Sequence, residues 1–338
     1  MKKKAFLSKT FAALLVAVMP LSMTPVGAAA AWKPTQPIEF VVTAGAGGGT
    51  DVFARTVQAI VTKYKLTDQP IVVLNKGGGS GAEGFLYGKA AAGDPYRVTF
   101  GTNNEYLLPQ IAKLAWKGDD FTPLAAMALD EFILWVNGDS PYKDAKSFID
   151  AAKAKPDTLK MGGSQAKDTD QTLTTLITVA TGAKFLYVPY KSGAEAAVQL
   201  AGGHIDANTN NPSESIGQWK AGMVRALCVF SPKPLAAGPK ITPTMGWSDI
   251  PPCRDNGIAI DQYQQPRTLW LPRGVPADAV AYYVDVLSKV RATPEWKEYI
   301  QRSAQTDQFL TGTELQHFIA DNDEKSRKVF EQQGWLVH

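Results

Sequence analysis

The chain has 338 residues, of which 35 are basic and 32 acidic, giving a formal charge of +3. Its three histidines, His204, His317 and His338, lie far apart and have no HExxH or CxxC companion, so we expect no metal site. No stretch rich in lysine and arginine indicates a nucleic-acid-binding face. About 307 residues remain outside a predicted leader, which is more than one hydrophobic core commonly serves, and this predicts two lobes.

Residues 1–31 have the three parts of a secretory signal peptide. Lysines occupy positions 2, 3, 4 and 9, an apolar stretch runs from Phe11 to Met19, and small residues fill positions 27–31. We expect cleavage between Ala28 and Trp32. Removing four lysines leaves 31 basic against 32 acidic residues, a charge of −1, so the basic balance belongs largely to the leader. No later stretch approaches the roughly eighteen uninterrupted apolar residues of a membrane span, and we expect an exported, soluble chain.

Cys228 and Cys253 are the only cysteines. An exported chain with an even number of cysteines favours a disulfide bond between them. The alternative is that both are buried as small apolar residues. The sequence alone leaves both alternatives open.

The segment from residue 38 to residue 64 combines a short apolar strand, a glycine-rich loop and an amphipathic helix. The loop carries Gly45, Gly47, Gly48 and Gly49, which let backbone N–H groups approach a ligand without obstruction by a Cβ atom. Thr50 or Asp51 can cap the helix that follows. Its apolar residues recur at helical spacing at positions 53, 57, 60, 61 and 64 and indicate packing on a sheet. A helix that begins in this way offers unpaired N–H donors to an anion.

Two further units of strand and loop follow in the first third of the chain. Strands are expected at 71–74 and 97–100, with a glycine-rich loop at 75–84, a helix ending near Gly93, and a polar loop at 101–104. Strands alternating with helices predict a parallel sheet, whose loops gather at the carboxyl ends of the strands. Open sheets of this kind bind ligands at that edge.

The alternation restarts after a break at 137–142 and predicts a second α/β lobe. Its strands are expected at 159–161, 185–188, 204–207 and 224–229, most of them followed by polar loops. A strand at 263–271 and helical segments from Pro276, Thr293 and Thr313 complete the chain. We therefore predict an α/β, two-lobed periplasmic-binding-protein fold of the Venus flytrap, type II-like class, with two parallel or mixed sheets and a hinge. The first lobe is expected to comprise 32–128 and 261–338 and the second 129–260, with crossings near 128–131 and 258–262.

Enzyme chemistry has weak support in the sequence. Residues 79–84 match GxGxxG between a strand and a helix, and Glu105 lies about twenty residues on, as in dinucleotide-binding proteins. An exported compartment offers little nicotinamide cofactor, however, and no P-loop motif occurs. Ser80 lies in GGSGA, which lacks the last glycine of a GxSxG nucleophile elbow. We expect a binding protein without cofactor rather than an enzyme, and an exported nucleotide-dependent oxidoreductase or a hydrolase is the alternative.

The polar loops offer neutral hydrogen-bonding groups that can hold carboxylate oxygens without a full counter-charge. The same residue types often serve only as caps and turns. Asp51 stands four residues before Arg55, and we favour a structural role for it over direct ligand contact. The candidate ligand-binding residues are Gly47, Gly48, Gly49, Thr50, Asp51, Gly79, Ser80, Asn103, Asn104, Ser164, Asp168, Thr169, Asn208, Asn210 and Asn211.

An ordered series of segments resembles the solute receptors of the tripartite tricarboxylate transporter family, the TctC-like or Bug proteins. The series covers nearly the whole exported chain. It comprises AGGGTDVFAR at 46–55, DQPIVVLNKGGGSG at 68–81, GDPYRVTFGTN at 93–103, DDFTPLA at 119–125, VPYKSG at 188–193 and LAGGHIDA at 200–207.

The resemblance implies a periplasmic receptor, expected to be a monomer, that closes over an organic carboxylate and serves one large and one small integral membrane subunit. It also implies that Gly47–Thr50 and Gly79–Ser80 hold one carboxylate. The chain departs from the family at 162–171, where GGSQAKDTDQ places Asp168 and Thr169 at positions that are commonly Gly-Ser. We predict a receptor for a dicarboxylate, aliphatic or aromatic. A receptor that signals to a sensor kinase would use the same site.

Overall fold

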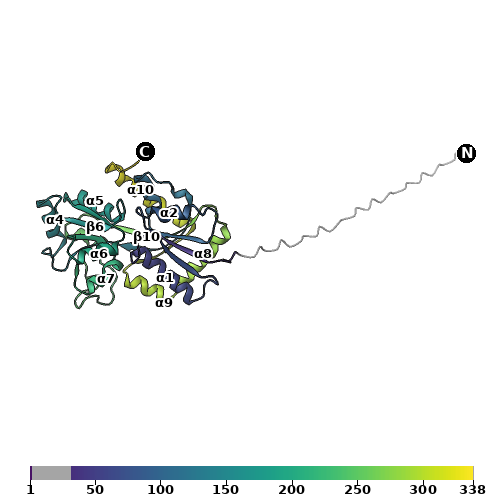
Figure 1. Cartoon of the computed structure of the whole chain (residues 1–338), viewed down its shortest axis with the longest axis horizontal. Helices are drawn as coiled ribbons and strands as arrows, with labels where there is room; N and C mark the ends of the chain where they lie inside the picture. Colours follow the sequence, from purple (N-terminus) through teal and green to yellow (C-terminus); the bar gives the residue numbers. More distant parts are fainter. Residues whose placement is uncertain (2–31, 338) are drawn as a thin grey trace. The chain divides into compact units, whose positions relative to one another are not determined.

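A computed structural model describes Met1 and residues 32–337 of the chain (Figure 1). The predicted signal peptide lies outside the described residues, apart from Met1. None of the helices in residues 32–337 has the length and apolar composition needed to cross a membrane.

The first sheet has six strands in the order β11-β4-β10-β3-β1-β2. β1 pairs in parallel with β2 and β3, whereas β10 runs antiparallel to β3 and β4, and β11 runs antiparallel to β4. The sheet is therefore mixed, as predicted. Its strands are β1 (Ile38–Val42), β2 (Ile71–Asn75), β3 (Arg97–Gly101), β4 (Phe121–Glu131), β10 (Gln264–Pro272) and β11 (Thr306–Leu310).

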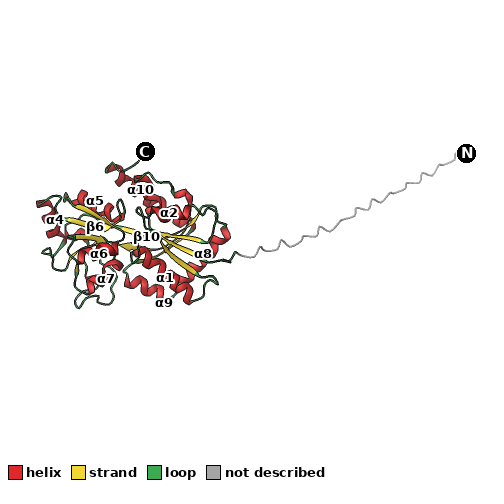
Figure 2. Ribbon diagram, viewed as in Figure 1, coloured by secondary structure: helices red, strands yellow, loops and turns green. Residues whose placement is uncertain are grey.

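Helices cover both faces of this sheet (Figure 2). One face packs against α1 (Gly49–Lys63), α8 (Ala277–Arg291) and α9 (Pro294–Arg302), with Phe53, Val57 and Trp296 in its core. The other face packs against α2 (Ala82–Lys89), α3 (Asn104–Ile111) and α10 (Gly312–Gln332). The predicted apolar stripe of α1 is buried as far as residue 61, but Tyr64 is the C-cap and is exposed.

The second sheet has five strands in the order β7-β6-β8-β5-β9 and is also mixed. One of its cores contains residues of α4 and α5, and the other contains residues of α6 and α7. Its strands are β5 (Ile133–Asn137), β6 (Lys160–Ser164), β7 (Leu186–Tyr190), β8 (Ala207–Asn210) and β9 (Val224–Val229). Its helices are α4 (Ala145–Ala154), α5 (Thr169–Thr181), α6 (Gly193–Ala201) and α7 (Pro212–Lys220).

The chain passes between the two sheets twice among the described residues. β4 ends at Glu131 in the first sheet and β5 begins at Ile133 in the second, so only Phe132 lies between them. The return runs from β9 to β10 through a proline-rich segment that contains two short 3-10 helices, η2 (Trp247–Asp249) and η3 (Cys253–Asn256). A third, η1 (Gly118–Asp120), precedes β4. We call the part built on the six-stranded sheet the first lobe and the part built on the five-stranded sheet the second lobe.

Several elements differ from the sequence-based prediction. The sequence-based prediction did not include helices α3 and α7 or strand β11. Each of these elements is short and is either mostly polar or interrupted by proline. The strand expected at 204–207 begins only at Ala207, since residues 202–206 form the turn after α6. Asn208 and Asn210 were placed in a loop and lie instead inside β8, where both are fully buried. Their polar character, which suggested a loop, is accommodated at Asn210 by a hydrogen bond to the Gly193 carbonyl.

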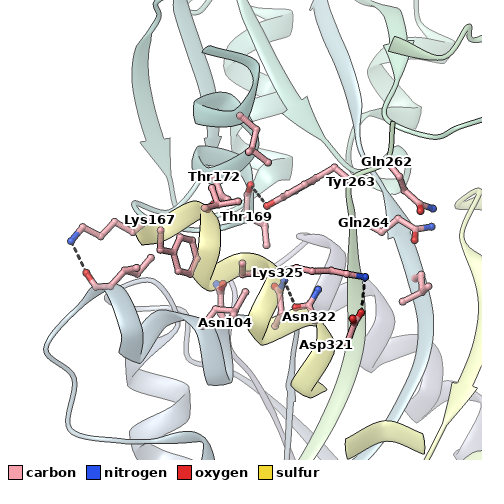
Figure 3. A pocket seen from close by; sticks show the side chains of 18 of the residues that line it. Asn104, Lys167, Thr169, Thr172, Gln262, Tyr263, Gln264, Asp321, Asn322 and Lys325 are labelled. Carbon is pink, nitrogen blue, oxygen red and sulfur yellow. Dashed lines mark hydrogen bonds and ion pairs between the residues drawn. The ribbon is translucent and has the colours of Figure 1, made fainter. Parts of the chain in front are cut away.

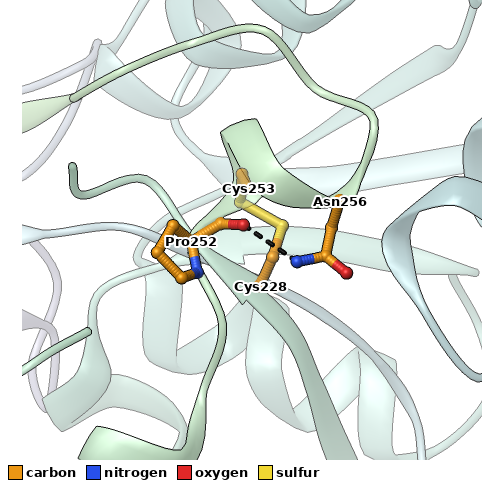
Figure 4. The surroundings of a disulfide bond; sticks show 4 residues. All are labelled: Cys228, Pro252, Cys253 and Asn256. Carbon is orange, nitrogen blue, oxygen red and sulfur yellow. Dashed lines mark hydrogen bonds between the residues drawn. A yellow bond between two sulfur atoms is a disulfide. The ribbon is translucent and has the colours of Figure 1, made fainter. Parts of the chain in front are cut away.

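Cys228 and Cys253 form a disulfide bond (Figure 4). It joins β9 to η3, and both cysteines are fully buried in the second lobe. The Asn256 amide donates to the Pro252 carbonyl at 3.0 Å and supports the same turn. The two alternatives for these cysteines are thus resolved in favour of a bridge that fastens the proline-rich return segment to the sheet.

Replacing both cysteines with alanine should lower the free energy of unfolding by about 3 kcal/mol, because the bond closes a loop with a sequence separation of 25 residues. Urea unfolding of the two proteins measures this difference. A reductant should lower the stability of the parent by a similar amount and leave the double variant unchanged. Equal stability of parent and variant would contradict the prediction.

Candidate functional site

The glycine-rich loop before α1 is held by Asp51. Asp51 is buried and accepts hydrogen bonds from the Gly47 N–H, the Arg55 Nε and the Asn75 Nδ2, each at 2.9 Å. Burial acts to raise the pKa of Asp51, but hydrogen bonds from Gly47 and Arg55 bring it below its ordinary value. Asp51 is therefore an ionised anchor for the loop, and it does not line the cavity described next.

A cavity of about 40 Å³ lies between the lobes at the ends of their strands. By volume it has room for about three water-sized groups. The first lobe and β10 contribute Thr43, Ala44, Gly48, Gly49, Thr50, Thr102, Asn104, Gln265 and Arg267, and the second contributes Ser164, Gln165, Asp168, Lys191, Ser192, Gly193, Asn211 and Glu214. We call it the smaller cavity, because a larger one is described below. Of the predicted residues, it brings together Gly48, Gly49, Thr50, Asn104, Ser164, Asp168 and Asn211.

Arg267 is a buried, positively charged residue that lines the smaller cavity. Its Nε donates to Asp130 Oδ2 at 3.0 Å, and its Nη2 makes a second bond to the same oxygen. Two further N–H groups reach Thr50 Oγ1 at 3.2 Å and Asn211 Oδ1 at 3.1 Å. Burial alone would lower the pKa of Arg267, but the charge of Asp130 raises it, so the guanidinium stays protonated. Thr50 and Asn211 come from different lobes, and Arg267 thus binds both.

Two carboxylates face the smaller cavity. Glu214 Oε1 accepts the Gly49 N–H at 2.9 Å, at the first turn of α1. Asp168 is the N-cap of α5 and accepts from Thr169 N and Asn104 Nδ2, both at 2.6 Å, and from Ser164 Oγ at 3.0 Å. Burial raises the pKa of both carboxyl groups. Within the described part of the chain, neither has a basic nitrogen within the 4.0 Å of a salt bridge.

Hydrogen bonds between the glycine loops and the second lobe hold the lobes together. The Ser80 hydroxyl donates to the Ala166 carbonyl at 2.8 Å, and Gln165 Nε2 donates to the Gly77 carbonyl at 3.0 Å. Lys167 Nζ donates to the Ile111 carbonyl at 2.8 Å. Ser80 therefore joins the lobes. Neither Ser80 nor Gly79 lines this cavity or the larger one described next. Gly47, Asn208 and Asn210 also lie outside both cavities.

A larger cavity of about 340 Å³ lies beside α10, α3 and α5 (Figure 3). It takes up two predicted residues, Asn103 and Thr169, and it shares Asn104 with the smaller cavity. The Tyr263 hydroxyl donates to the Thr169 carbonyl at 2.9 Å on one wall. The opposite wall is the inner face of α10, with Asp321, Asn322 and Lys325. Its lining mixes amides and hydroxyls with leucine, phenylalanine and valine side chains.

Sequence reasoning missed Glu214, Gln265 and Arg267. Glu214 follows Asn211-Pro212, and this spacing is the signature of a capping box, which the structure contains. That signal places Glu214 at the start of a helix beside a strand end. Arg267 lies in β10 shortly before the apolar residues Leu269, Trp270 and Leu271, and a charged residue in a buried strand usually has a partner or a function. No comparable sequence signal marked four other residues that line the smaller cavity, which are Thr43, Gln165, Lys191 and Ser192.

The dinucleotide-binding alternative placed Glu105 near a ribose. Glu105 is instead fully buried in α3, and it lines neither cavity. Burial raises the pKa of Glu105 well above its ordinary value. Among the residues that the structure describes, no group of three or more His, Cys, Asp or Glu side chains could hold a metal ion.

Gly49 makes room for Arg267. A Cβ atom at residue 49 would lie 2.2 Å from Arg267 Nη2, so Gly49→Ala should displace the guanidinium and lower the free energy of unfolding by roughly 1–3 kcal/mol. Gly217→Ala in α7 is the matched control, because a Cβ there meets nothing within 4 Å and should stabilise the helix by about 0.5–1 kcal/mol. Chemical unfolding measures both, and equal effects would contradict this account.

Glu131 gives stability a pH dependence. It ends β4, accepts a hydrogen bond from Gln264, and burial raises its pKa to about 7 from an ordinary 4.5. Between these values the folded state holds a proton that the unfolded state has lost, so stability falls as the pH rises through this window. Glu131→Gln should remove roughly 3 kcal/mol of this loss between pH 5 and pH 8. Unfolding curves at both pH values test this, and identical profiles for parent and variant would refute it.

The sequence is similar to a known family of proteins along most of its length. The sequence model described as "Tripartite tricarboxylate transporter family receptor" matches residues 53–335. A Cupriavidus necator protein, "UPF0065 protein in gbd 5'region", is 26% identical over 339 residues, covering 99% of this chain and 98% of its own.

Solved structures show the same fold. A protein described as a periplasmic transporter is 25% identical with a TM-score of 0.81, covering 90% of this chain and 99% of its own. Rpa4515 of R. palustris, solved with adipate, is 23% identical with a TM-score of 0.80, and the match covers 89% of this chain and 98% of Rpa4515. MatC from Rhodopseudomonas palustris, with bound malate, is 21% identical with a TM-score of 0.77, and the match covers 88% of this chain and 99% of MatC. The predicted periplasmic-binding-protein fold is thereby confirmed, and the chain belongs to the tripartite tricarboxylate transporter receptor family.

Proposed function

We propose that the chain is a periplasmic receptor, exported by a cleaved leader, that captures a small organic carboxylate between its lobes. We further propose that the ligand is a dicarboxylate, aliphatic or aromatic, and that the receptor delivers it as a monomer to a large and a small membrane subunit. The observation that carries the proposal is the cavity enclosed by strand-end loops from both lobes, and because its volume of about 40 Å³ is smaller than a diacid, the lobes would move apart to admit the ligand. Two proteins of this fold were solved with adipate and malate, which are dicarboxylic acids, and this supports the ligand class.

The groups around the smaller cavity suit a carboxylate. α1 and α6 both begin at its wall, at Gly49 and Gly193, so two helix N-termini border it. Helix N-termini carry partial positive charge and favour an anion. Arg267 adds a full positive charge beside Thr50. The Gly49 N–H already donates to Glu214, so a ligand carboxylate at this wall would be held mainly by the start of α6 and by Arg267.

Binding between the lobes also explains how a receptor of this shape can report occupancy. A ligand that contacts both lobes favours the closed form by the difference in its affinity for the two forms. Ser80, Gln165 and Glu214 already join the lobes through backbone groups. These contacts supply part of the closed interface, and the ligand would supply the remainder.

Isothermal titration calorimetry against aliphatic and aromatic mono-, di- and tricarboxylates tests the proposal. We expect heat from at least one dicarboxylate. A thermal-shift screen with NAD(P) and neutral sugars beside the acids tests the enzyme alternative. No binding of any acid, together with a shift by a nucleotide, would overturn the proposal.

Thr50→Val should weaken carboxylate binding about fivefold to tenfold, because it removes one hydrogen bond at the cavity wall worth about 1 kcal/mol. Thr56→Val is the matched control. Thr56 lies on the same helix, its hydroxyl donates to the Val52 carbonyl, and it does not line the smaller cavity. Calorimetry on both variants gives the comparison, and equal affinities of the two would show that Thr50 takes no part.

A further inference from the structure

Glu214 of the second lobe places its carboxylate at the start of a helix of the first lobe. Its Oε1 accepts the N–H of Gly49, the first residue of α1, at 2.9 Å. The two residues are 165 positions apart in the chain, and the bond joins the lobes. The N-terminus of a helix carries unpaired N–H donors and partial positive charge, which favour an anion. Glu214 is therefore an anion supplied by the protein itself, at a position that suits the carboxylate of a ligand.

Glu214 makes this contact more closely than the cap of its own helix. It is the third residue of α7, where a glutamate commonly reaches back to the N-cap N–H. That bond, from Asn211 N to Glu214 Oε2, is 3.4 Å long, whereas the Gly49 bond across the lobes is 2.9 Å long. Glu195 has the same third position in α6, and it accepts the N–H of Lys191, just before its own helix, at 3.1 Å. A capping role alone therefore does not account for the position of Glu214.

The start of α6 leaves room for the same carboxylate. A Cβ atom at Gly193, the first residue of α6, would lie 2.1 Å from Glu214 Oε2 and 2.5 Å from its Cδ, so a side chain there would displace the carboxylate. The carboxylate of Glu214 thus lies against the first residues of two helices, Gly49 of the first lobe and Gly193 of the second. This is the wall at which the proposed function expects a ligand carboxylate.

No cation ties Glu214 to this position within the described residues. Burial raises the pKa of Glu214, and the charge of Arg267, which lines the same cavity, opposes that shift. Arg267 nevertheless directs its Nε and Nη2 to Asp130, and Glu214 has no basic nitrogen within the 4.0 Å of a salt bridge. Replacing Glu214 with a ligand carboxylate would exchange one N–H···O contact for another of the same kind, so the exchange loses little.

We propose that Glu214 is an internal competitor of the ligand: its carboxylate occupies the anion position at the start of α1 and joins the lobes, and a ligand carboxylate binds there by displacing it. With Glu214 in place, a ligand has only the start of α6 and Arg267; with Glu214 displaced, it also gains the Gly49 N–H. Glu214 also forms part of the wall that limits the cavity to about 40 Å³. The apparent affinity falls with the share of molecules in which Glu214 holds the position. This inference rests on the proposed function and adds a regulation to its site.

Two variants at residue 214 test the inference by isothermal titration calorimetry with the dicarboxylate that binds the parent best. Glu214→Ala removes the internal carboxylate and should bind about tenfold more tightly, which corresponds to a parent in which about one molecule in ten has the position free. Glu214→Gln keeps the size and removes the charge, so it should show a smaller gain. Unchanged or weaker binding by both variants would overturn the inference. If Glu214→Ala does not fold, Glu214→Gln alone decides.

Glu195→Ala is the matched control for these measurements. Glu195 has the same place in its helix as Glu214, but its contact stays within the second lobe and it lines neither of the two cavities. Its affinity should equal that of the parent. A gain equal to that of Glu214→Ala would show that the effect is not specific to the contact with Gly49 and would overturn the inference.

A small carboxylate in solution gives a second test that needs no natural ligand. Acetate at pH 7 should fill the position vacated in Glu214→Ala and raise its Tm, because a ligand of the folded state stabilises that state. The parent and Glu195→Ala should gain less, since Glu214 holds the position in both. Acetamide has nearly the shape of acetate without its charge and should not reproduce the shift. Equal responses of the parent and Glu214→Ala to acetate would contradict the inference.

The two tests separate the inference from the proposed function. Suppose that the parent binds a dicarboxylate, but residue 214 gives no gain and acetate no selective shift. That result would overturn the inference and leave the proposed function standing. Failure of every acid in the panel with parent and variants, together with a selective response of Glu214→Ala to acetate, would overturn the proposed function and leave Glu214 as the occupant of an anion position.

Discussion

The buried guanidinium of Arg267 is the constraint on which the centre of the molecule depends. A guanidinium cannot shed its proton in a protein, so its burial must be compensated by hydrogen bonds and an opposite charge. Asp130 of β4 supplies the charge, and Thr50 and Asn211 supply further acceptors from the two lobes. Gly49 has no side chain, which leaves space for the guanidinium. One side chain of β10 thereby fixes the neighbouring strand, the start of α1 and the loop after β8.

The N-terminal ends of helices are the second organising feature, and the protein already uses several of them for its own carboxylates. Asp168 caps α5, and Glu214 reaches across the lobes to the start of α1. Each carboxylate receives a backbone N–H group that would otherwise lack a partner, and the contact of Glu214 also joins the two lobes. The same contacts change the electrostatic character of the cavity from a plain anion site to one of mixed sign.

Local patterns predicted much of the fold, because they depend on neighbouring residues. The glycine loop and the stripe of α1 were recognisable from spacing, as were the two alternating α/β halves. Asn208 and Asn210 show where such reasoning fails: the polar tetrapeptide at 207–210 forms a buried strand, in which the Asn210 amide nitrogen donates to the distant Gly193 carbonyl but the Asn208 side-chain amide has no hydrogen-bond partner among the residues that the structure describes. Arg267 and Glu214 were missed for the same reason. Their partners lie 137 and 165 residues away along the chain, and no local pattern encodes such contacts.

The position of Asn104 has a consequence for how the receptor can change during evolution. Asn104 lines both cavities, and its amide binds Asp168, which lines only the smaller one. A substitution at residue 104 would alter the wall of both cavities at once and release a carboxylate that the smaller one contains. The two cavities are therefore not independent targets of selection. Adaptation of either one to a new occupant is restricted by what the other requires of the same side chain.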